Sequence, residues 1–121
     1  MENLFLVGQI VLGLYFVMAG LMHFMKMKDM VGYAKMKKLP MPEVAVGLSG
    51  LVMVLGGAGI LFQTSLVFAY WALIAFLVLS AFLMHNFWTQ NDPQAKMMDM
   101  VNFQKNLALA AALLILLTQL S

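Results

Sequence analysis

The fold is decided by two apolar stretches, VAVGLSGLVMVLGGAGILF (residues 44–62) and LVFAYWALIAFLVLSAFLM (residues 66–84), which are separated only by Gln63-Thr64-Ser65. Between residues 44 and 91 there is no Asp, Glu, Lys or Arg. A helix needs about 20 apolar residues to cross the hydrocarbon core of a bilayer. The region is therefore long enough for two crossings that turn at Gln63-Thr64-Ser65.

The rest of the chain adds one crossing on each side. Overall, 64% of the residues are hydrophobic and 10% are charged, whereas soluble domains carry about 25% charged residues. We predict a single transmembrane domain over residues 1–121, an all-α integral membrane four-helix bundle in contact with the lipid bilayer. Its spans are expected near residues 4–25, 43–62, 66–88 and 103–120.

The first span is expected to stay in the mature protein. Glu2 precedes it, no lysine occurs before Lys26, and no small-x-small site follows the apolar stretch. A cleaved signal peptide has a basic N-terminal region and such a site.

The positive charges indicate the topology. All seven are lysines, and each lies either in the segment after the first span or between the third and fourth spans: Lys26, Lys28, Lys35, Lys37, Lys38, Lys96 and Lys105. Loops rich in Lys and Arg stay in the cytoplasm. We therefore expect both termini on the extracytoplasmic side.

Composition also excludes several functions. The chain has no cysteine, so thiol–disulfide exchange, iron–sulfur clusters and cysteine-ligated metals are excluded within it. No basic cluster with interleaved aromatic residues indicates a nucleic-acid partner. A redox role would have to rest on a bound cofactor or on another protein.

Two short segments between the spans have helical patterns. In residues 26–39, an apolar stripe lies beside lysines that point elsewhere, which is typical of a short interfacial amphipathic helix. The stripe is Met27, Met30, Val31 and Ala34, and the lysines are Lys28, Lys35, Lys37 and Lys38. Asn91-Asp92-Pro93 resembles a helix start, with a short amphipathic piece leading into the fourth span.

Small residues predict where helices pack closely, because close approach favours helix association in lipid. In the first span, Gly13 and Gly20 share one helical face with Gln9, Phe16 and His23. The second span carries Gly47, Gly50, Gly56 and Gly57. We assign these glycines to helix packing.

Polar residues from the span ends are expected at one depth on the cytoplasmic side. Ionisable groups in the membrane need a partner or a cavity, so we expect a structural ion pair between Glu43 and Lys105. Either the histidines anchor the helix ends, or the polar residues hold a quinone headgroup within apolar walls. The cofactor-binding set would be His23, His85, Asn86, Lys105 and Asn106.

Haem is a further interpretation, since two histidines could flank an iron. We rank it below quinone because histidines at helix ends are common and no other haem signal is present. No metal site is expected, because zinc takes three or four protein ligands.

Two segments resemble the DoxX family. Residues 103–110, FQKNLALA, closely resemble the F-x-K-N-L-A-L-x-G signature that opens the family's last helix. Residues 19–24, AGLMHF, resemble the A-G-x-x-H/K-F end of its first helix. Pro40-x-Pro42, Gly56-Gly57 and His85-Asn86-Phe87-Trp88 follow in the matching order, so the resemblance covers nearly the whole chain.

The resemblance implies a four-helix protein of the bacterial inner membrane. The relatives that gave the family its name include the membrane subunit of a thiosulfate:quinone oxidoreductase. Others resemble accessory partners of membrane redox complexes, and distant animal relatives are receptor-assembly chaperones. Many members carry a glutamate ahead of the paired glycines in the second helix, where this chain has Met53 or a neighbour. A mechanism that needs this carboxylate does not transfer.

The leading functional interpretation is a membrane subunit or accessory protein of a quinone-linked redox system. Lys105 and Asn106 would orient the headgroup, and His23 or His85 would exchange a proton. No residue is identified as catalytic. The alternative is a non-catalytic scaffold or assembly factor that holds a protein partner, or a second copy, on its glycine-rich faces. A small transporter ranks lower, because no span is broken.

Overall fold

The computed structural model describes residues 1–120 as a set of helices. They are α1 (Glu2–Met25), α2 (Met27–Met36), α3 (Pro42–Phe62), α4 (Leu66–Met84), the short 3-10 helix η1 (Phe87–Thr89) and α5 (Pro93–Thr118). Four are long and apolar enough to cross a membrane: α1, α3, α5 and α4 with its extension to Thr89. The predicted all-α membrane bundle is confirmed, and α2 is the expected short helix between the first two spans.

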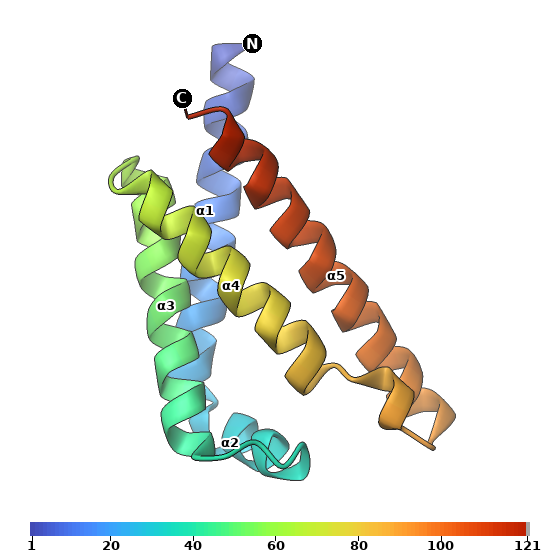
Figure 1. Cartoon of the computed structure of the whole chain (residues 1–121). Helices are drawn as coiled ribbons and strands as arrows, with labels where there is room; N and C mark the ends of the chain where they lie inside the picture. The colour runs from blue at the N-terminus through green and yellow to red at the C-terminus, as the bar shows by residue number, and fades with distance from the viewer. Residues whose placement is uncertain (121) are drawn as a thin grey trace.

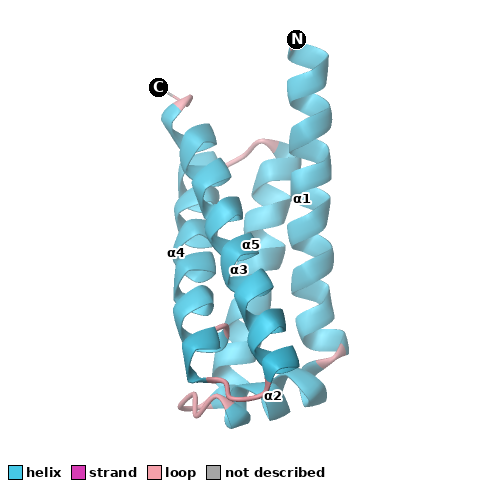
Figure 2. Cartoon of the chain, turned by 90° about the vertical axis from the view of Figure 1, so that its right-hand side faces the viewer, coloured by secondary structure: helices cyan, strands magenta, loops and turns pink. Residues whose placement is uncertain are grey.

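The bundle consists of two helix pairs. α1 packs along α3, α4 packs along α5, and contacts between α3 and α4 join the pairs. Both termini and the α3–α4 turn lie at one end of the bundle, while α2 and η1 lie at the other (Figure 1). α4 and α5 run obliquely away from α1 and α3 toward the end that α2 crosses (Figure 1), whereas in the view turned by 90° the long helices run roughly in the same direction (Figure 2).

Local sequence sets the helix ends. Pro42 begins α3, and Gln63 and Ser65 adopt left-handed conformations (φ 51° for both) in the tight turn to α4. At the start of α5, the Asp92 carboxylate accepts a hydrogen bond from the Ala95 amide at 3.1 Å, as an N-cap does. The predicted helix start at Asn91-Asp92-Pro93 is therefore confirmed.

The fourth span differs from the prediction. We expected a short amphipathic piece followed by a span from about residue 103, but α5 is one helix from Pro93 to Thr118. No glycine or proline follows Pro93 to interrupt it. Lys105 consequently lies about three turns into the helix instead of at its start.

Close contacts between α1 and α3 are made through glycines. A Cβ added at Gly20 would lie 2.7 Å from the Gly50 carbonyl oxygen, and one at Gly57 would lie 2.7 Å from the Gly13 carbonyl oxygen. Gly56 instead faces Leu73 of α4, at 2.7 Å. These are the predicted packing glycines, except that Gly47 has open space, with Met27 nearest at 3.8 Å.

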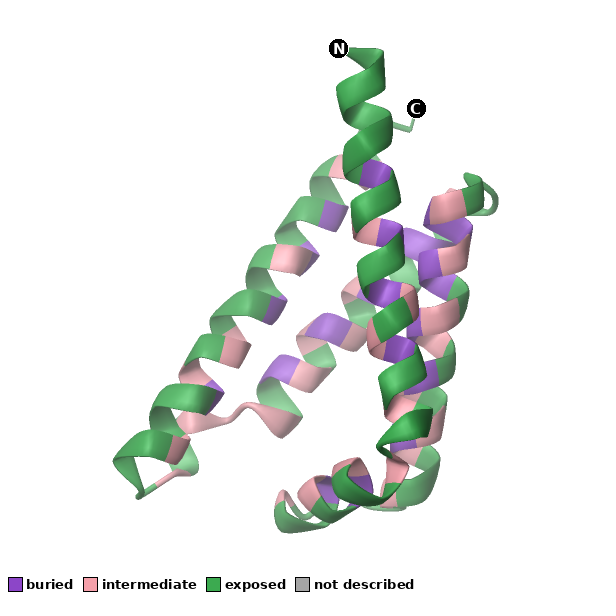
Figure 3. Ribbon diagram, turned by 180° about the vertical axis from the view of Figure 1, so that it is seen from behind, coloured by how far each residue is buried: buried purple, intermediate pink, exposed green. Residues whose placement is uncertain are grey.

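The buried core lies between the pairs, and the outer faces are apolar but exposed (Figure 3). The largest fully buried side chains are Phe16, Ile60, Tyr70, Leu73 and Leu113. Exposed apolar faces suit helices whose surroundings are lipid. The apolar stripe of α2 turns inward, where Val31 and Ala34 cluster with Val46 of α3. α2 is thus packed onto the bundle.

Candidate functional site

A cavity of about 920 Å³, called the central cavity below, lies among α1, α2, α3, α4 and α5. Four of the five residues predicted to bind a cofactor line it: His23, His85, Lys105 and Asn106. The fifth, Asn86, does not line the cavity. Most other lining residues are apolar, including Met53, Phe76 and Leu77. A mostly apolar cavity with a few polar groups is the usual form of a small-ligand site.

Asn106 is the most informative of these residues. It is only 5% exposed, lines the cavity, and forms no side-chain hydrogen bond with any residue that the structure describes. The residue as a whole is buried, but its amide atoms are not among the enclosed side-chain atoms that lack a partner, so they open to the cavity. The Asn106 amide is therefore free to hydrogen-bond a molecule in the cavity.

The position of the His23 ring is set by its own helix. Nδ1 lies 2.9 Å from the carbonyl oxygen of Ala19. A carbonyl oxygen can only accept, so Nδ1 carries the hydrogen in this contact, and in the neutral ring Nε2 keeps its lone pair. The ring also meets Phe76 edge-on, with 6.3 Å between centroids. His23 can thus offer an acceptor to the cavity.

The expected ion pair between Glu43 and Lys105 is wrong. Glu43 lies 3.9 Å from Lys35 instead, with both side chains well exposed to solvent. The reason is the early start of α5: Lys105 is in its middle, whereas Glu43 is in the first turn of α3, beside α2. Within residues 1–120, no ion pair involves Lys105.

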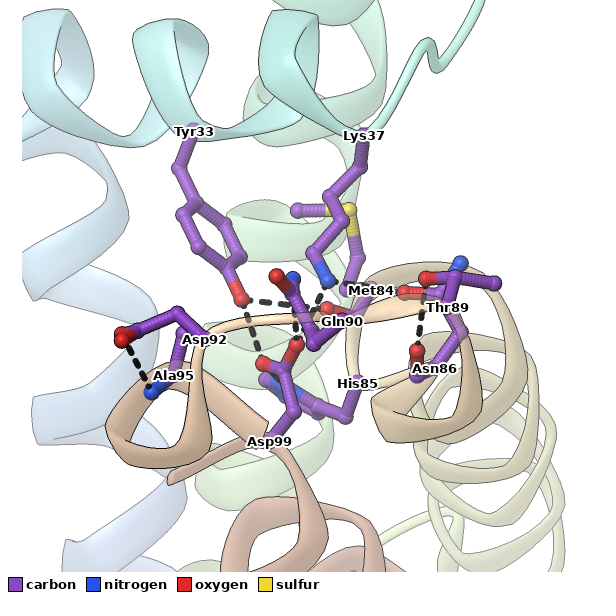
Figure 4. A network of polar contacts seen from close by, with 10 residues as sticks. All are labelled: Tyr33, Lys37, Met84, His85, Asn86, Thr89, Gln90, Asp92, Ala95 and Asp99. Atoms are coloured by element: carbon purple, nitrogen blue, oxygen red, sulfur yellow. Dashed lines mark hydrogen bonds and ion pairs between the residues drawn. The ribbon is translucent and has the colours of Figure 1, made fainter. Parts of the chain in front are cut away.

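A buried polar network that the sequence did not predict closes the α2 end of the bundle (Figure 4). At its centre is Asp99 of α5, which is 3% exposed. Its carboxylate accepts hydrogen bonds from Tyr33 Oη at 2.6 Å, Lys37 Nζ at 2.6 Å and Gln90 Nε2 at 2.9 Å. Lys37 Nζ also donates to Asn86 Oδ1 at 2.7 Å. The network therefore ties α2 to α5 and to the segment after α4.

The network holds α2 over one end of the cavity. Met30, Tyr33 and Ala34 of α2 line the cavity wall there. Burial, together with the hydrogen bond and the negative charge of Asp99, raises the pKa of the Tyr33 hydroxyl. Tyr33 is therefore a hydrogen-bond donor to Asp99 at every physiological pH.

His85 joins the network to the cavity. It lines the cavity, and its Nδ1 lies 3.8 Å from Asp99 Oδ1, too far for a hydrogen bond. This nitrogen is buried and has no hydrogen-bond partner in the described chain. His85 therefore lies beside both the cavity and the Asp99 carboxylate.

The lysine assignment in α2 needs one correction. Lys37 was expected to point away from the apolar side, but its side chain is 6% exposed and points to Asp99 (Figure 4). Asp99 was missed altogether. The available signal was a carboxylate at residue 99 ahead of a membrane span, which needs a partner if the helix is continuous.

Metal binding gains no support. Among the described residues, no group of three or more His, Cys, Asp or Glu side chains could hold an ion. His23 and His85 share the cavity, but no further side chain there is specific to haem.

The comparisons with known proteins give the family. A family model described as DoxX matches residues 4–86, which is more than half of the chain, so this protein belongs to the DoxX family. The 103–110 segment, which carries part of the resemblance, lies outside the matched range. No curated protein and no solved structure matches the chain.

Proposed function

We propose that this member of the DoxX family binds a quinone in the central cavity, as the membrane subunit or accessory protein of a quinone-linked redox system. One observation carries the proposal: the buried side chain of Asn106 lines the cavity without a hydrogen-bond partner in the described chain. A quinone carbonyl supplies the acceptor that this amide lacks.

The lining can hold both redox states of such a ligand. The Asn106 amide and the Lys105 ammonium group donate to the carbonyl oxygens of a quinone. Nε2 of His23 accepts from the hydroxyl group of a quinol, since Nδ1 is engaged with Ala19. Apolar side chains such as Met53 and Phe76 contact the ring. The same cavity therefore suits a ligand that cycles between acceptor and donor.

Electrons come from a partner in this proposal. The chain has no cysteine, so it holds no thiol pair or cysteine-ligated iron–sulfur cluster that could supply them. Reduction of a quinone also takes up protons, and His85 lies between the cavity and the Asp99 network. We assign His85 to proton exchange with the bound headgroup, a role that suits an imidazole near neutral pH.

The glycine contacts favour this function over the scaffold alternative. A scaffold would use its glycine-rich faces to hold helices of other proteins. Here Gly13, Gly20, Gly50 and Gly57 are used in the contact between α1 and α3 of the same chain. The surface around these four glycines is therefore unavailable to a partner, whereas Gly47 has open space.

The test is to identify what the protein binds. Protein purified in mild detergent is extracted, and its small molecules are identified by mass spectrometry. We expect quinone with the wild type and little with Asn106→Leu. The matched control is Asn102→Leu, the same substitution one helical turn earlier at a residue that does not line the cavity. It should retain quinone.

Two results would contradict the proposal. Wild-type protein that carries only phospholipid, and that takes up no added quinone, would favour the scaffold. A Soret band in the visible spectrum of the purified protein would favour haem.

A further inference from the structure

A second hollow, called the α1–α5 groove below, lies between the first and last helices. Its volume is about 810 Å³. Apolar side chains form most of its walls: Leu4, Phe5, Leu12, Leu109, Ala112 and Leu116. The pairs α1–α3 and α4–α5 pack closely along their lengths. α1 and α5 do not, and they only run past each other (Figures 1 and 3). The groove is thus an apolar opening on the membrane-facing side of the bundle.

The groove and the central cavity adjoin each other. Tyr15 of α1 and Lys105 of α5 line both of them. The cavity extends from these two residues toward α2, and the groove extends from them toward the termini. The two hollows therefore meet at Tyr15 and Lys105.

Lys105 marks the boundary between the two hollows. It is a charged residue within a predicted span, and no ion pair with residues 1–120 neutralises it. Ionisable groups inside membranes line cavities or pair with another group, and they mark functional sites. Beyond Lys105, the α5 side of the groove is apolar as far as Leu116. The lining therefore changes from polar to apolar along one path.

The floor of the groove is closed toward α4. Gln9 lines the groove but is only 4% exposed, and its Nε2 donates to Tyr70 Oη at 3.2 Å. This buried contact joins α1 to α4 behind the groove. A chain in the groove consequently lies along the surface between α1 and α5 and does not pass through the bundle.

Because the two hollows meet at shared lining residues, we infer that the α1–α5 groove holds the hydrophobic tail of the ligand whose headgroup occupies the central cavity. The ligand class is then a long-tailed isoprenoid quinone, which enters sideways from the membrane between α1 and α5. From Lys105 to Leu116 the helix rises about 16 Å, enough for a tail of a few isoprene units. The inference rests on the proposed function and adds the tail as a determinant of specificity.

The chain offers a matched pair of variants for the test. Gly8 lines the groove, Gly32 of α2 lines neither hollow, and a Cβ added at either meets nothing within 4 Å. Gly8→Trp therefore fills the groove without disturbing helix contacts, and Gly32→Trp adds the same side chain elsewhere. The dissociation constants of a tail-less quinone and of one with several isoprene units are measured for wild type and both variants.

We expect Gly8→Trp to weaken binding of the long-tailed quinone by about tenfold or more, with tail-less quinone unaffected and Gly32→Trp like wild type. Three results would overturn the inference. The first is that Gly8→Trp weakens binding of the tail-less and the long-tailed quinone equally. The second is that Gly8→Trp changes the binding of neither quinone. A change of oligomeric mass in Gly8→Trp would assign the groove to a second copy of the chain. If wild type binds neither quinone, the proposed function itself fails.

Discussion

Lys37 Nζ lies 2.6 Å from Asp99 Oδ2, and the two side chains are only 6% and 4% exposed. This ion pair joins the short helix α2 to the start of α5 (Figure 4), beside Tyr33 and His85, which line the central cavity. Tyr33, Asn86 and Gln90 complete the hydrogen bonds of the pair. The pair is therefore the main polar connection that holds α2 in place.

Removing one partner of this pair should destabilise the protein strongly. Asp99→Asn or Lys37→Met leaves a buried charge uncompensated, and such changes cost about 3 to 5 kcal/mol. The double variant Lys37→Met/Asp99→Leu should recover part of the loss, because neither charge remains. Unfolding in detergent, followed by circular dichroism, measures the effect.

The control for this prediction is the exposed pair of Lys35 and Glu43, in which the side chains are 63% and 66% exposed. Lys35→Met should change the free energy of unfolding by less than about 1 kcal/mol. Equal losses for Lys35→Met and Lys37→Met would show that the buried pair has no special role.

The glycine contacts predict that the loss of stability caused by a larger side chain depends on which glycine is replaced. Gly20→Val and Gly57→Val place carbon atoms against backbone of the opposite helix, which cannot move without separating α1 from α3. We expect a loss of about 1 to 3 kcal/mol for each. Gly47→Val, at a position with open space, should be tolerated. Similar melting temperatures for all three would contradict the packing described here.

The environment of Tyr33 predicts that the protein loses stability at alkaline pH. Its pKa is raised by burial, by its hydrogen bond to Asp99 and by the charge of that carboxylate. Its protonated form is thus favoured in the folded state. The resulting stability is complete below the ordinary tyrosine pKa of about 10 and is lost as pH rises from there through the raised pKa.

The unfolding free energies of wild type and Tyr33→Phe, measured from pH 8 to 12, test this. Their difference should be constant up to about pH 10 and should shrink above it. A tyrosinate absorbance change assigned to Tyr33 at the ordinary pKa would refute the expectation.

The topology is testable because the chain has no cysteine. The distribution of the lysines predicts that both termini and the α3–α4 turn face outward and that α2 faces the cytoplasm. Gln63→Cys should therefore react with a membrane-impermeant maleimide in intact cells, and Lys38→Cys should react only after lysis. The opposite pattern would reverse the assigned orientation.

The sequence predicted the helices and the packing glycines because both depend on local composition and periodicity. It also named His23, His85, Lys105 and Asn106, which line one cavity, although Lys105 and Asn106 lie in the middle of α5 and not at a span end as the prediction assumed. The sequence did not predict side-chain pairings that depend on where a helix starts and on which of its sides faces the bundle. The pairing of Lys37 with Asp99 requires α5 to extend back to Pro93 and α2 to turn its Lys37 side inward.

The incorrect pairing of Glu43 with Lys105 has the same origin. Placing the start of the fourth helix near residue 103 puts Lys105 at the level of Glu43, whereas the N-cap at Asp92 starts the helix earlier. Charge alone could not choose among seven lysines. The exact helix start decides which carboxylate each of them can reach.

The most direct test of a ligand in the central cavity is photolabelling with an azidoquinone, followed by mass-spectrometric mapping of the labelled residues. We expect labels on cavity-lining residues such as Met53 and Phe76, competition by unlabelled quinone, and loss of labelling in Asn106→Leu. Labelling that unlabelled quinone does not displace, or that falls on outward-facing residues such as Phe68 as strongly as on the cavity lining, would contradict it.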